Sequence, residues 1–178
     1  MENEKFFGEI KEDYAPSFYS EFKFKIPYFD TEAEIILGNE YDENGEDIDT
    51  PPTDLQLVEY VHIFKSFLNN IDEILPDIQQ SAFKYYKDVY AKYYEKPFED
   101  IFDLYKGTET ENDKTHPPLC LDTKEKHFEY MREIINIQII ENQTLKIAIH
   151  YSLDTEHGLE LKLANNKVVA VGGIAETY

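Results

Sequence analysis

The most regular pattern in the chain is an alternation of hydrophobic and polar residues near its C-terminus. Every second side chain is apolar in residues 145–153 and again in residues 159–163, as is typical of β-strands with one buried face. Residues 154–158 supply a turn between these stretches. Asparagines at 165–166 tolerate positive φ and lead into an apolar run at 167–173. The pattern predicts a three-stranded C-terminal meander.

A second alternating stretch lies near the N-terminus. Apolar residues alternate with lysines in residues 22–26, and Pro27 then ends that strand. After a turn, residues 33–37 repeat the alternation, which predicts an N-terminal β-hairpin. Residues 1–17 carry scattered aromatic side chains and predict a short first strand that ends before Pro16.

Apolar residues at helical spacing predict two helices in the middle of the chain. Thr53 and Gln56 have the spacing of a capping box, which marks a helix start. The apolar stripe that follows comprises Leu57, Val58, Val61, Phe64, Phe67, Leu68 and Ile71. Pro76 suits the first turn of a second helix. The apolar face of that helix comprises Ile78, Ala82, Tyr85, Tyr86, Val89 and Tyr93. We expect the two helices to pack as an antiparallel pair on a sheet.

The C-terminal third predicts one more helix and one more strand before the meander. Thr123 is placed to cap a short helix with the apolar face Phe128, Met131, Ile134 and Ile135, and residues 137–140 follow as a strand. Residues 106–118 are polar and predict an exposed connector. No regular βαβ alternation is present, so we predict a single α+β domain over residues 1–178. Its antiparallel sheet, from the N-terminal hairpin and the C-terminal meander, would pack on two or three helices.

Composition adds a strong acidic bias to this picture. The 178 residues include 37 Asp and Glu against 17 Lys and Arg, a formal net charge of −20. This charge disfavours nucleic acid as a partner, because binding to phosphates depends on Lys and Arg. With 14 Tyr and 12 Phe, the chain is too aromatic for a disordered acidic tail. The charge therefore serves solubility, or it steers association with a basic protein.

The same composition suggests a compartment. Cys120 is the single cysteine, so an intramolecular disulfide is excluded and a reducing cytosol is the simplest environment. The residues Met1–Lys5 do not begin a secretory signal, and no apolar run approaches the ~20 residues of a membrane span. We expect a soluble, cytoplasmic protein with no membrane partner.

Residues 38–52 are rich in acids and predict a loop. Asp42, Asn44 and Glu46 fall at the first, third and fifth positions of a calcium-loop spacing. However, Asp47 stands where that loop needs glycine, and Thr53 replaces the bidentate glutamate. The pattern favours a solvated acidic loop over a calcium site. We predict neither a metal nor a cofactor.

No strong catalytic motif is present, and the best local candidate is the turn of the meander. It carries Asp154, Glu156 and His157, with His150 just upstream. An imidazole beside carboxylates can act as a general acid or base or supply metal ligands. The competing interpretation is that these side chains only build a sheet corner. A zinc set is weaker, because its members His116, Cys120 and His127 lack close paired spacing; Cys120 is more simply a buried small residue.

Five tyrosines cluster around the second predicted helix: Tyr85, Tyr86, Tyr90, Tyr93 and Tyr94. The structural interpretation buries their rings at the edge of the core while the hydroxyls reach water. The functional interpretation makes them a binding patch for a protein, because Tyr is enriched at interface hot spots.

The run Asp154–Leu159, followed by Val168–Gly172, resembles a bacterial family of uncharacterised domains. That family ends in an Asp-x-Glu-His-Gly-hydrophobic motif and then a Val-x-x-Val-Gly strand. Gln56 and Tyr85-Tyr86 are similar to its Gln-containing helix and its Tyr-Tyr helix, whereas Leu153 stands where an aromatic residue commonly precedes the Asp. The resemblance implies an immunity protein that neutralises a toxin, and it carries over no catalytic residues.

Two classes of function follow from these observations. The first is a binding protein, such as an immunity protein, whose acidic and Tyr-rich surface covers a basic toxin. The alternative is a small hydrolase or metal-dependent enzyme in which the side chains at the turn, residues 154–158, converge with His150. A third hypothesis is mimicry of DNA by the acidic surface. The sequence favours the binding protein over an enzyme.

Overall fold

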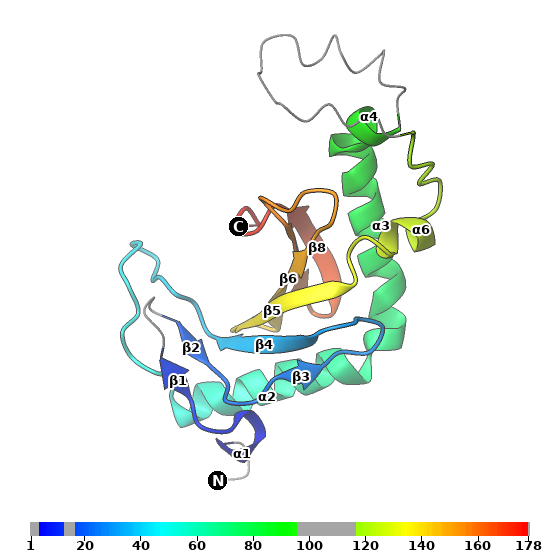
Figure 1. Cartoon of the computed structure of the whole chain (residues 1–178). Coiled ribbons are helices and arrows are strands. Elements are labelled where there is room, and N and C mark those ends of the chain that lie inside the picture. The colour runs from blue at the N-terminus through cyan, green and yellow to red at the C-terminus, as the bar shows by residue number, and fades with distance from the viewer. Residues whose placement is uncertain (1–3, 13–16, 96–116, 178) are drawn as a thin grey trace.

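The computed structural model describes residues 4–12, 17–95 and 117–177. Its strands are β1 (Lys11–Glu12), β2 (Phe18–Tyr19), β3 (Phe24–Lys25), β4 (Glu32–Leu37), β5 (Glu133–Ile140), β6 (Thr144–His150), β7 (Leu159–Ala164) and β8 (Lys167–Gly172). Its helices are α1 (Glu4–Phe7), α2 (Asp54–Asn69), α3 (Ile71–Val89), α4 (Ala91–Tyr94) and α6 (Lys124–Phe128). The strands of these ranges form one sheet, shown with the helices in Figure 1.

The strand order is β1-β2-β4-β5-β6-β7-β8. Strand β3 lies off this path and pairs with β4. Every pairing is antiparallel except that of β4 with β5, which run parallel with Ile35 opposite Ile137. The predicted α+β class is confirmed, and the sheet is mixed at this one pairing. The N-terminal hairpin and the C-terminal meander thus join into a continuous sheet.

The C-terminal meander is confirmed as β6, β7 and β8. Asn165 and Asn166 adopt φ of 50° and 59°, as expected for the tight turn between β7 and β8. Strand β6 ends at His150, earlier than the alternation predicts. Tyr151 and Leu153 are buried, but they lie in the turn segment. Alternate side chains therefore remain buried beyond the end of β6, where the backbone no longer pairs with a neighbouring strand.

The capping box at the start of α2 is confirmed. The Gln56 backbone N–H donates to Thr53 Oγ1 over 3.4 Å, and the Thr53 N–H donates to Gln56 Oε1 over 2.9 Å. Leu57, Val61, Phe64 and Phe67 of the predicted stripe are buried. Val58 is 46% exposed, so its place in the stripe was wrong.

The relation predicted between the two long helices is wrong. Helix α3 begins at Ile71, so Pro76 lies inside it and not in its first turn. Asn70 is the single residue between the helices, and one residue cannot reverse the chain into an antiparallel pair. In Figure 1, α2 runs below β3 and β4, and α3 turns away from it to rise beside β5 and β8.

The other predicted elements are confirmed in part. Thr123 caps α6 by accepting a hydrogen bond from Lys126, but α6 ends at Phe128. Ile134 and Ile135 belong to β5, because pairing with β6 overrides their helical spacing. The N-terminal segment contains α1 as well as β1, and its predicted end at residues 13–16 lies outside the described residues, as does most of the connector.

The core lies between the helices and the sheet face that they cover. Phe64 of α2 is fully buried in a cluster of aromatic rings. The ring centroids of its neighbours lie 5.1–6.4 Å away; these neighbours are Phe6, Phe7, Phe24 and Phe67. Residues far apart in the sequence therefore bring α1, α2 and β3 together at one point.

Residues 173–177, which we call the C-terminal hook, fold back onto the sheet through Glu160 of β7. Glu160 is 6% exposed and accepts hydrogen bonds from the hydroxyl of Thr177 and, over 3.4 Å, from the backbone N–H of Ala175. The Lys146 ammonium lies 3.6 Å from the same carboxylate. This buried carboxylate therefore fixes the hook against strand β7 of the sheet.

Replacing Glu160 with Gln is expected to lower the free energy of unfolding by about 2 kcal/mol, because the hydrogen bonds in the buried site lose their charged partner. Urea unfolding measures the change. Glu156→Gln alters the same charge at an exposed position and should be nearly neutral. Equal effects of the two substitutions would contradict a special role for Glu160.

Candidate functional site

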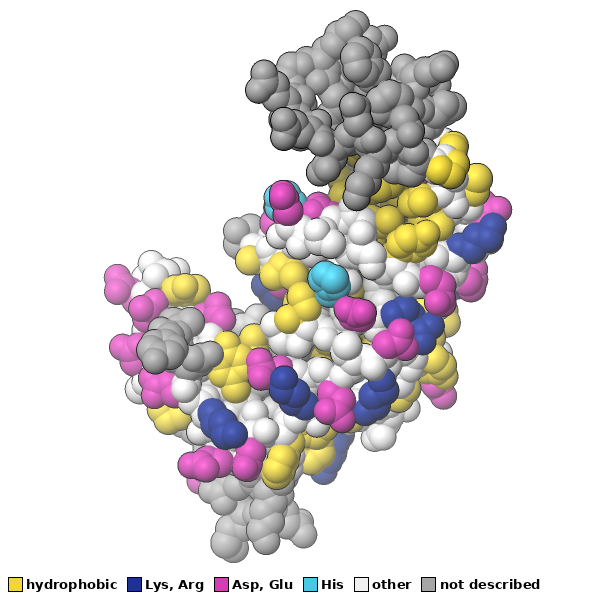
Figure 2. All heavy atoms as spheres, viewed as in Figure 1, with side chains coloured by type: hydrophobic (Ala, Val, Ile, Leu, Met, Phe, Trp, Pro, Cys, Tyr) yellow, Lys and Arg dark blue, Asp and Glu magenta, His cyan; other side chains and the backbone are white. Residues whose placement is uncertain are grey.

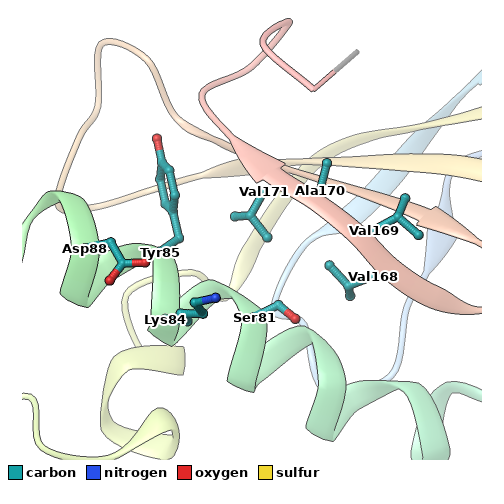
Figure 3. A pocket seen from close by; sticks show the side chains of 8 residues that line it. All are labelled: Ser81, Lys84, Tyr85, Asp88, Val168, Val169, Ala170 and Val171. Atoms are coloured by element: carbon teal, nitrogen blue, oxygen red, sulfur yellow. The ribbon is translucent and has the colours of Figure 1, made fainter.

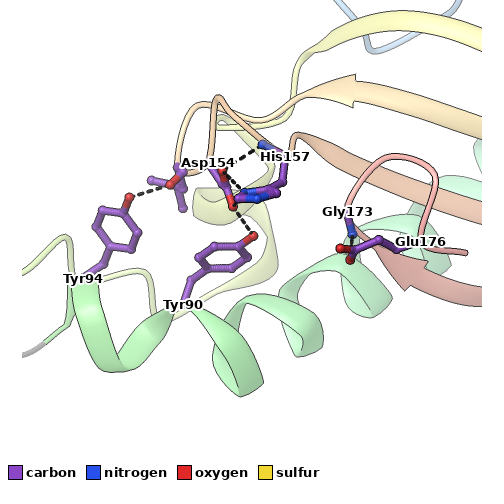
Figure 4. A network of polar contacts seen from close by, with 7 residues as sticks. Tyr90, Tyr94, Asp154, His157, Gly173 and Glu176 are labelled. Atoms are coloured by element: carbon purple, nitrogen blue, oxygen red, sulfur yellow. Dashed lines mark hydrogen bonds and ion pairs between the residues drawn. The ribbon is translucent and has the colours of Figure 1, made fainter. Parts of the chain in front are cut away.

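The structure brings the predicted tyrosines onto the predicted turn. The Tyr90 hydroxyl donates to Asp154 Oδ2 over 2.8 Å, and the Tyr94 hydroxyl donates to the backbone oxygen of Leu153 over 2.5 Å (Figure 4). The ring of Tyr85 meets that of Tyr90 edge to face, with 5.8 Å between centroids. The end of α3, the helix α4 and the turn therefore form one polar cluster.

Asp154 is the centre of this cluster. Its side chain is 18% exposed, and both carboxylate oxygens lie 3.1 Å from His157 Nδ1. Partial burial opposes ionisation, but hydrogen bonds from the His157 backbone N–H, the Tyr90 hydroxyl and the His157 ring outweigh it and lower the pKa of Asp154. The hydrogen bond to Asp154 raises the pKa of His157, whose side chain is 63% exposed. The pair therefore favours the protonated form of a solvent-accessible imidazole.

The five tyrosines divide into one buried residue and four half-buried ones. Tyr86 is fully buried and donates to Glu95 Oε1 over 2.5 Å, and its burial raises the pKa of its hydroxyl. The others, Tyr85, Tyr90, Tyr93 and Tyr94, are half-buried. Tyr86 thus belongs to the core, whereas the other rings retain some exposed surface.

The remaining members of the predicted set lie elsewhere. His150 Nδ1 is 3.2 Å from Glu133 Oε2 on the neighbouring strand, and Glu156 is exposed. The hook was not predicted from the sequence: the Ile174 N–H donates to the backbone oxygen of His157 over 2.9 Å, and Glu176 accepts from the Gly173 N–H (Figure 4). The sequence after the two consecutive glycines, Gly172 and Gly173, has no pattern that predicts this contact.

The candidate zinc residues are not assembled in the described part of the chain. His116 lies outside it, Cys120 is exposed and His127 is fully buried. The prediction that Cys120 is buried was wrong, and its φ of 55° is in the left-handed region. Within residues 4–12, 17–95 and 117–177, no group of three or more His, Cys, Asp or Glu side chains is arranged to hold a metal ion.

The acidic loop of residues 38–52 is confirmed as a loop and projects from the sheet. Asp42 Oδ1 accepts from the backbone N–H groups of Asn44 and Glu46 over 2.8 and 3.0 Å, so this carboxylate closes its own turn. Figure 2 shows acidic side chains gathered on this projection. The exposed acids are Asp42, Glu43, Glu46, Asp47 and Asp49.

A family model described as a domain of unknown function, DUF6985, matches residues 6–178. The chain belongs to the DUF6985 family. The predicted resemblance is thus confirmed at the level of a family of unknown function. No curated protein and no solved structure matches this DUF6985 chain. Among its described residues, no helix has the length and apolar content needed to cross a membrane.

In this DUF6985 domain, Asp154→Asn is expected to move the pKa of His157 down towards its ordinary value, because Asp154 is the main cause of the increase. An NMR titration of the imidazole measures it. Glu156→Gln removes a weaker and more distant charge and should lower the pKa of His157 by less. An unchanged titration in Asp154→Asn would contradict the assigned pair.

The same substitution has a defined pH window. His157, with its raised pKa, stabilises the fold below about pH 6.5, and this contribution is lost as pH rises through the folded-state pKa. Asp154, with its lowered pKa, stabilises the fold above about pH 4, and this contribution is lost as pH falls through its folded-state pKa. The stability difference between the original chain and Asp154→Asn should therefore be largest between these values.

Proposed function

We propose that this DUF6985 chain is a protein-binding module of the immunity type, which covers a basic protein such as a toxin and so neutralises it. The observation that carries the proposal is the surplus of acid on the surface. If each of the 17 Lys and Arg side chains neutralised one of the 37 carboxylates, 20 would still be left over. A field of this sign attracts cationic partners and speeds their association.

The acidic loop supports this proposal because it is held in shape before any partner arrives. Backbone hydrogen bonds cross it from Asp42 to Glu46 over 2.9 Å, from Gly45 to Asp42 over 3.0 Å and from Ile48 to Glu40 over 3.0 Å. A preordered loop loses less conformational entropy when it binds. The backbone that carries its carboxylates is therefore held in place on a projecting surface.

The test combines protection and binding. Cells that express the product of an adjacent toxin gene should survive when this chain is co-expressed, and a pull-down should recover that basic protein. A triple variant of the loop, Glu43→Gln, Asp47→Asn and Asp49→Asn, should weaken binding by about tenfold or more, mainly through the association rate.

The matched control makes the same charge change away from the loop. Glu32→Gln, Glu125→Gln and Glu156→Gln remove three exposed carboxylates from other surfaces. The proposal requires the loop variant to lose more affinity than this control. Failure to protect cells, together with recovery of no basic partner, would contradict it.

A second candidate function is a small hydrolase, favoured by one observation. Asp154 orients His157 at 3.1 Å and raises its pKa, which is the arrangement of a general acid or base. This candidate requires hydrolysis of a simple ester that Asp154→Asn and His157→Asn abolish and Glu156→Gln preserves. Equal rates in all three variants would exclude the turn as the site of that reaction.

A further inference from the structure

Strand β8 ends the sheet and presents an apolar edge. Within the described residues, β7 is its only strand partner, so the outer edge of β8 has no strand alongside it. Its central sequence, Val168 to Gly172, contains no charge, and Val169 is 58% exposed. Natural sheets protect such edges with charges, proline, a cover or a β-bulge, since exposed N–H and C=O groups recruit another strand; of these, the described residues give the central part of β8 only a bulge, at Val169.

A groove runs between this edge and helix α3. It has a volume of about 250 Å³, and its strand wall is formed by residues 168–171. Its helix wall is formed by Ser81, Lys84, Tyr85 and Asp88, which follow one another at the spacing of a single helix face. Figure 3 shows the side chains of α3 and β8 that line the groove, with Ser81 and Lys84 lying between the helix and the strand. A strand edge facing a helix across a groove is a geometry in which extended peptides bind.

One contact already uses the outer edge. The Val168 N–H donates to Asp77 Oδ2 of α3 over 2.9 Å, which shows that a backbone donor of β8 faces the helix. The register with β7 shifts between Lys162 and Leu163, and this shift leaves Val169 as an extra residue between the paired Val168 and Ala170. Asp77 therefore closes one end of the groove, and the free part of the edge lies on its C-terminal side.

The charges around the groove select its occupant. Asp88 lines it and Asp77 closes it, while Glu176 of the hook lies close enough to Tyr85 to act on it electrostatically. Lys84 is four residues before Asp88 on the same helix face, so these two charges offset each other. The remaining acids favour a cationic segment. A second copy of this chain is disfavoured, because each copy carries a net charge of −20.

We propose that the groove between α3 and β8 binds an extended, basic segment of a partner protein, which adds as a strand to the free edge of β8. The segment places small or branched apolar residues against Val169 and Val171. Its Lys or Arg residues lie near Asp77 and Glu176, the acids that Lys84 does not offset. This inference rests on the proposed binding function and specifies where and how the partner is held.

The probe is the blocked peptide acetyl-Lys-Val-Lys-Val-Lys-Val-amide, titrated into the full chain labelled with ¹⁵N. We expect amide shifts at residues 168–172 of β8 and at residues 81–88 of α3. The same peptide with alternate backbone nitrogens methylated keeps its charge but cannot complete the ladder, so it should bind at least about tenfold more weakly.

The variant Val169→Lys puts a charge on the edge and should also weaken binding by about tenfold or more. Val58→Lys is the matched control, because it changes the same residue type at 46% exposure on α2. Loss in Val169→Lys with retention in Val58→Lys supports the proposal. Equal loss in both variants, peptide shifts outside the groove, or concentration-dependent shifts at β8 without peptide would overturn it.

The two proposals fail in different ways. If a basic partner is captured equally by the original chain and by Val169→Lys, the binding function stands and the β8 edge is not its site. If no basic partner is captured or neutralised, the binding function fails, and the peptide titration still decides whether the edge accepts a strand.

Discussion

Phe64→Ala is expected to lower the free energy of unfolding by about 3–5 kcal/mol. Phe64 is fully buried, and its ring contacts connect α1, α2 and β3. Truncation to Ala removes the buried apolar surface and leaves a cavity that these three elements fill only in part. Urea or guanidinium unfolding, followed by far-UV circular dichroism, measures the change.

The matched control is Leu55→Ala on the same helix. Leu55 is 80% exposed, so its truncation should change the free energy of unfolding by less than about 0.5 kcal/mol. If the two substitutions cost the same, the aromatic cluster around Phe64 would not be the centre of this part of the core.

Acidification from pH 6.5 to pH 4 is expected to remove about 3 kcal/mol of stability through one residue, His127. The side chain is fully buried, and its burial lowers the pKa to about 4. His127 Nε2 lies 2.7 Å from the Tyr151 hydroxyl, and Nδ1 has no hydrogen-bond partner within the described residues. The rings of Phe83 and Tyr86 pack against it, and among the described residues no charge offsets the effect of burial on its pKa.

The sign follows from proton binding in the two states. Below pH 6.5 the unfolded chain protonates His127, while the folded chain keeps it neutral until about pH 4. Protonation therefore favours the unfolded state across this interval, and stability falls as pH falls.

His127→Phe keeps a ring in the site and removes the titration. The loss of stability between pH 6.5 and pH 4 should be smaller in this variant by about 3 kcal/mol, as measured by urea unfolding at each pH. Comparing the slopes of the two proteins cancels the contributions of His157 and of the general acidic charge, which both proteins share. Parallel pH profiles would show that His127 does not titrate differently on folding.

The sequence predicts local elements well because their causes lie within a few residues. The capping box at Thr53 and the asparagine turn at Asn165 each need only neighbouring side chains, and the alternation from Leu145 onwards needs only one buried face. Where the sequence analysis went wrong, a competing contact came from elsewhere. Ile134 has helical spacing with Met131, but strand β6 supplies it with a better partner.

The candidate site shows the same limit. The turn and the tyrosines were each recognised, but the hydrogen bond that joins Tyr90 to Asp154 spans 64 positions of sequence. To predict that the two residues meet, one must know the direction in which α3 runs. Asn70 sets that direction, because it is the single residue between α2 and α3. Pro76 misled the sequence analysis because a proline inside a helix is costly and is usually found in the first turn.

The parallel pairing of β4 with β5 has a consequence for how the chain is made. Ile35 and its partner Ile137 are about a hundred positions apart, so a ribosome adding ~5–20 residues per second delivers the second roughly 5–20 seconds after the first. During that interval the edge of β4 that later pairs with β5 has no strand alongside it. A nascent chain stalled before residue 133 should therefore be a substrate for chaperones, whereas a released chain that includes β5 and the C-terminal meander should not.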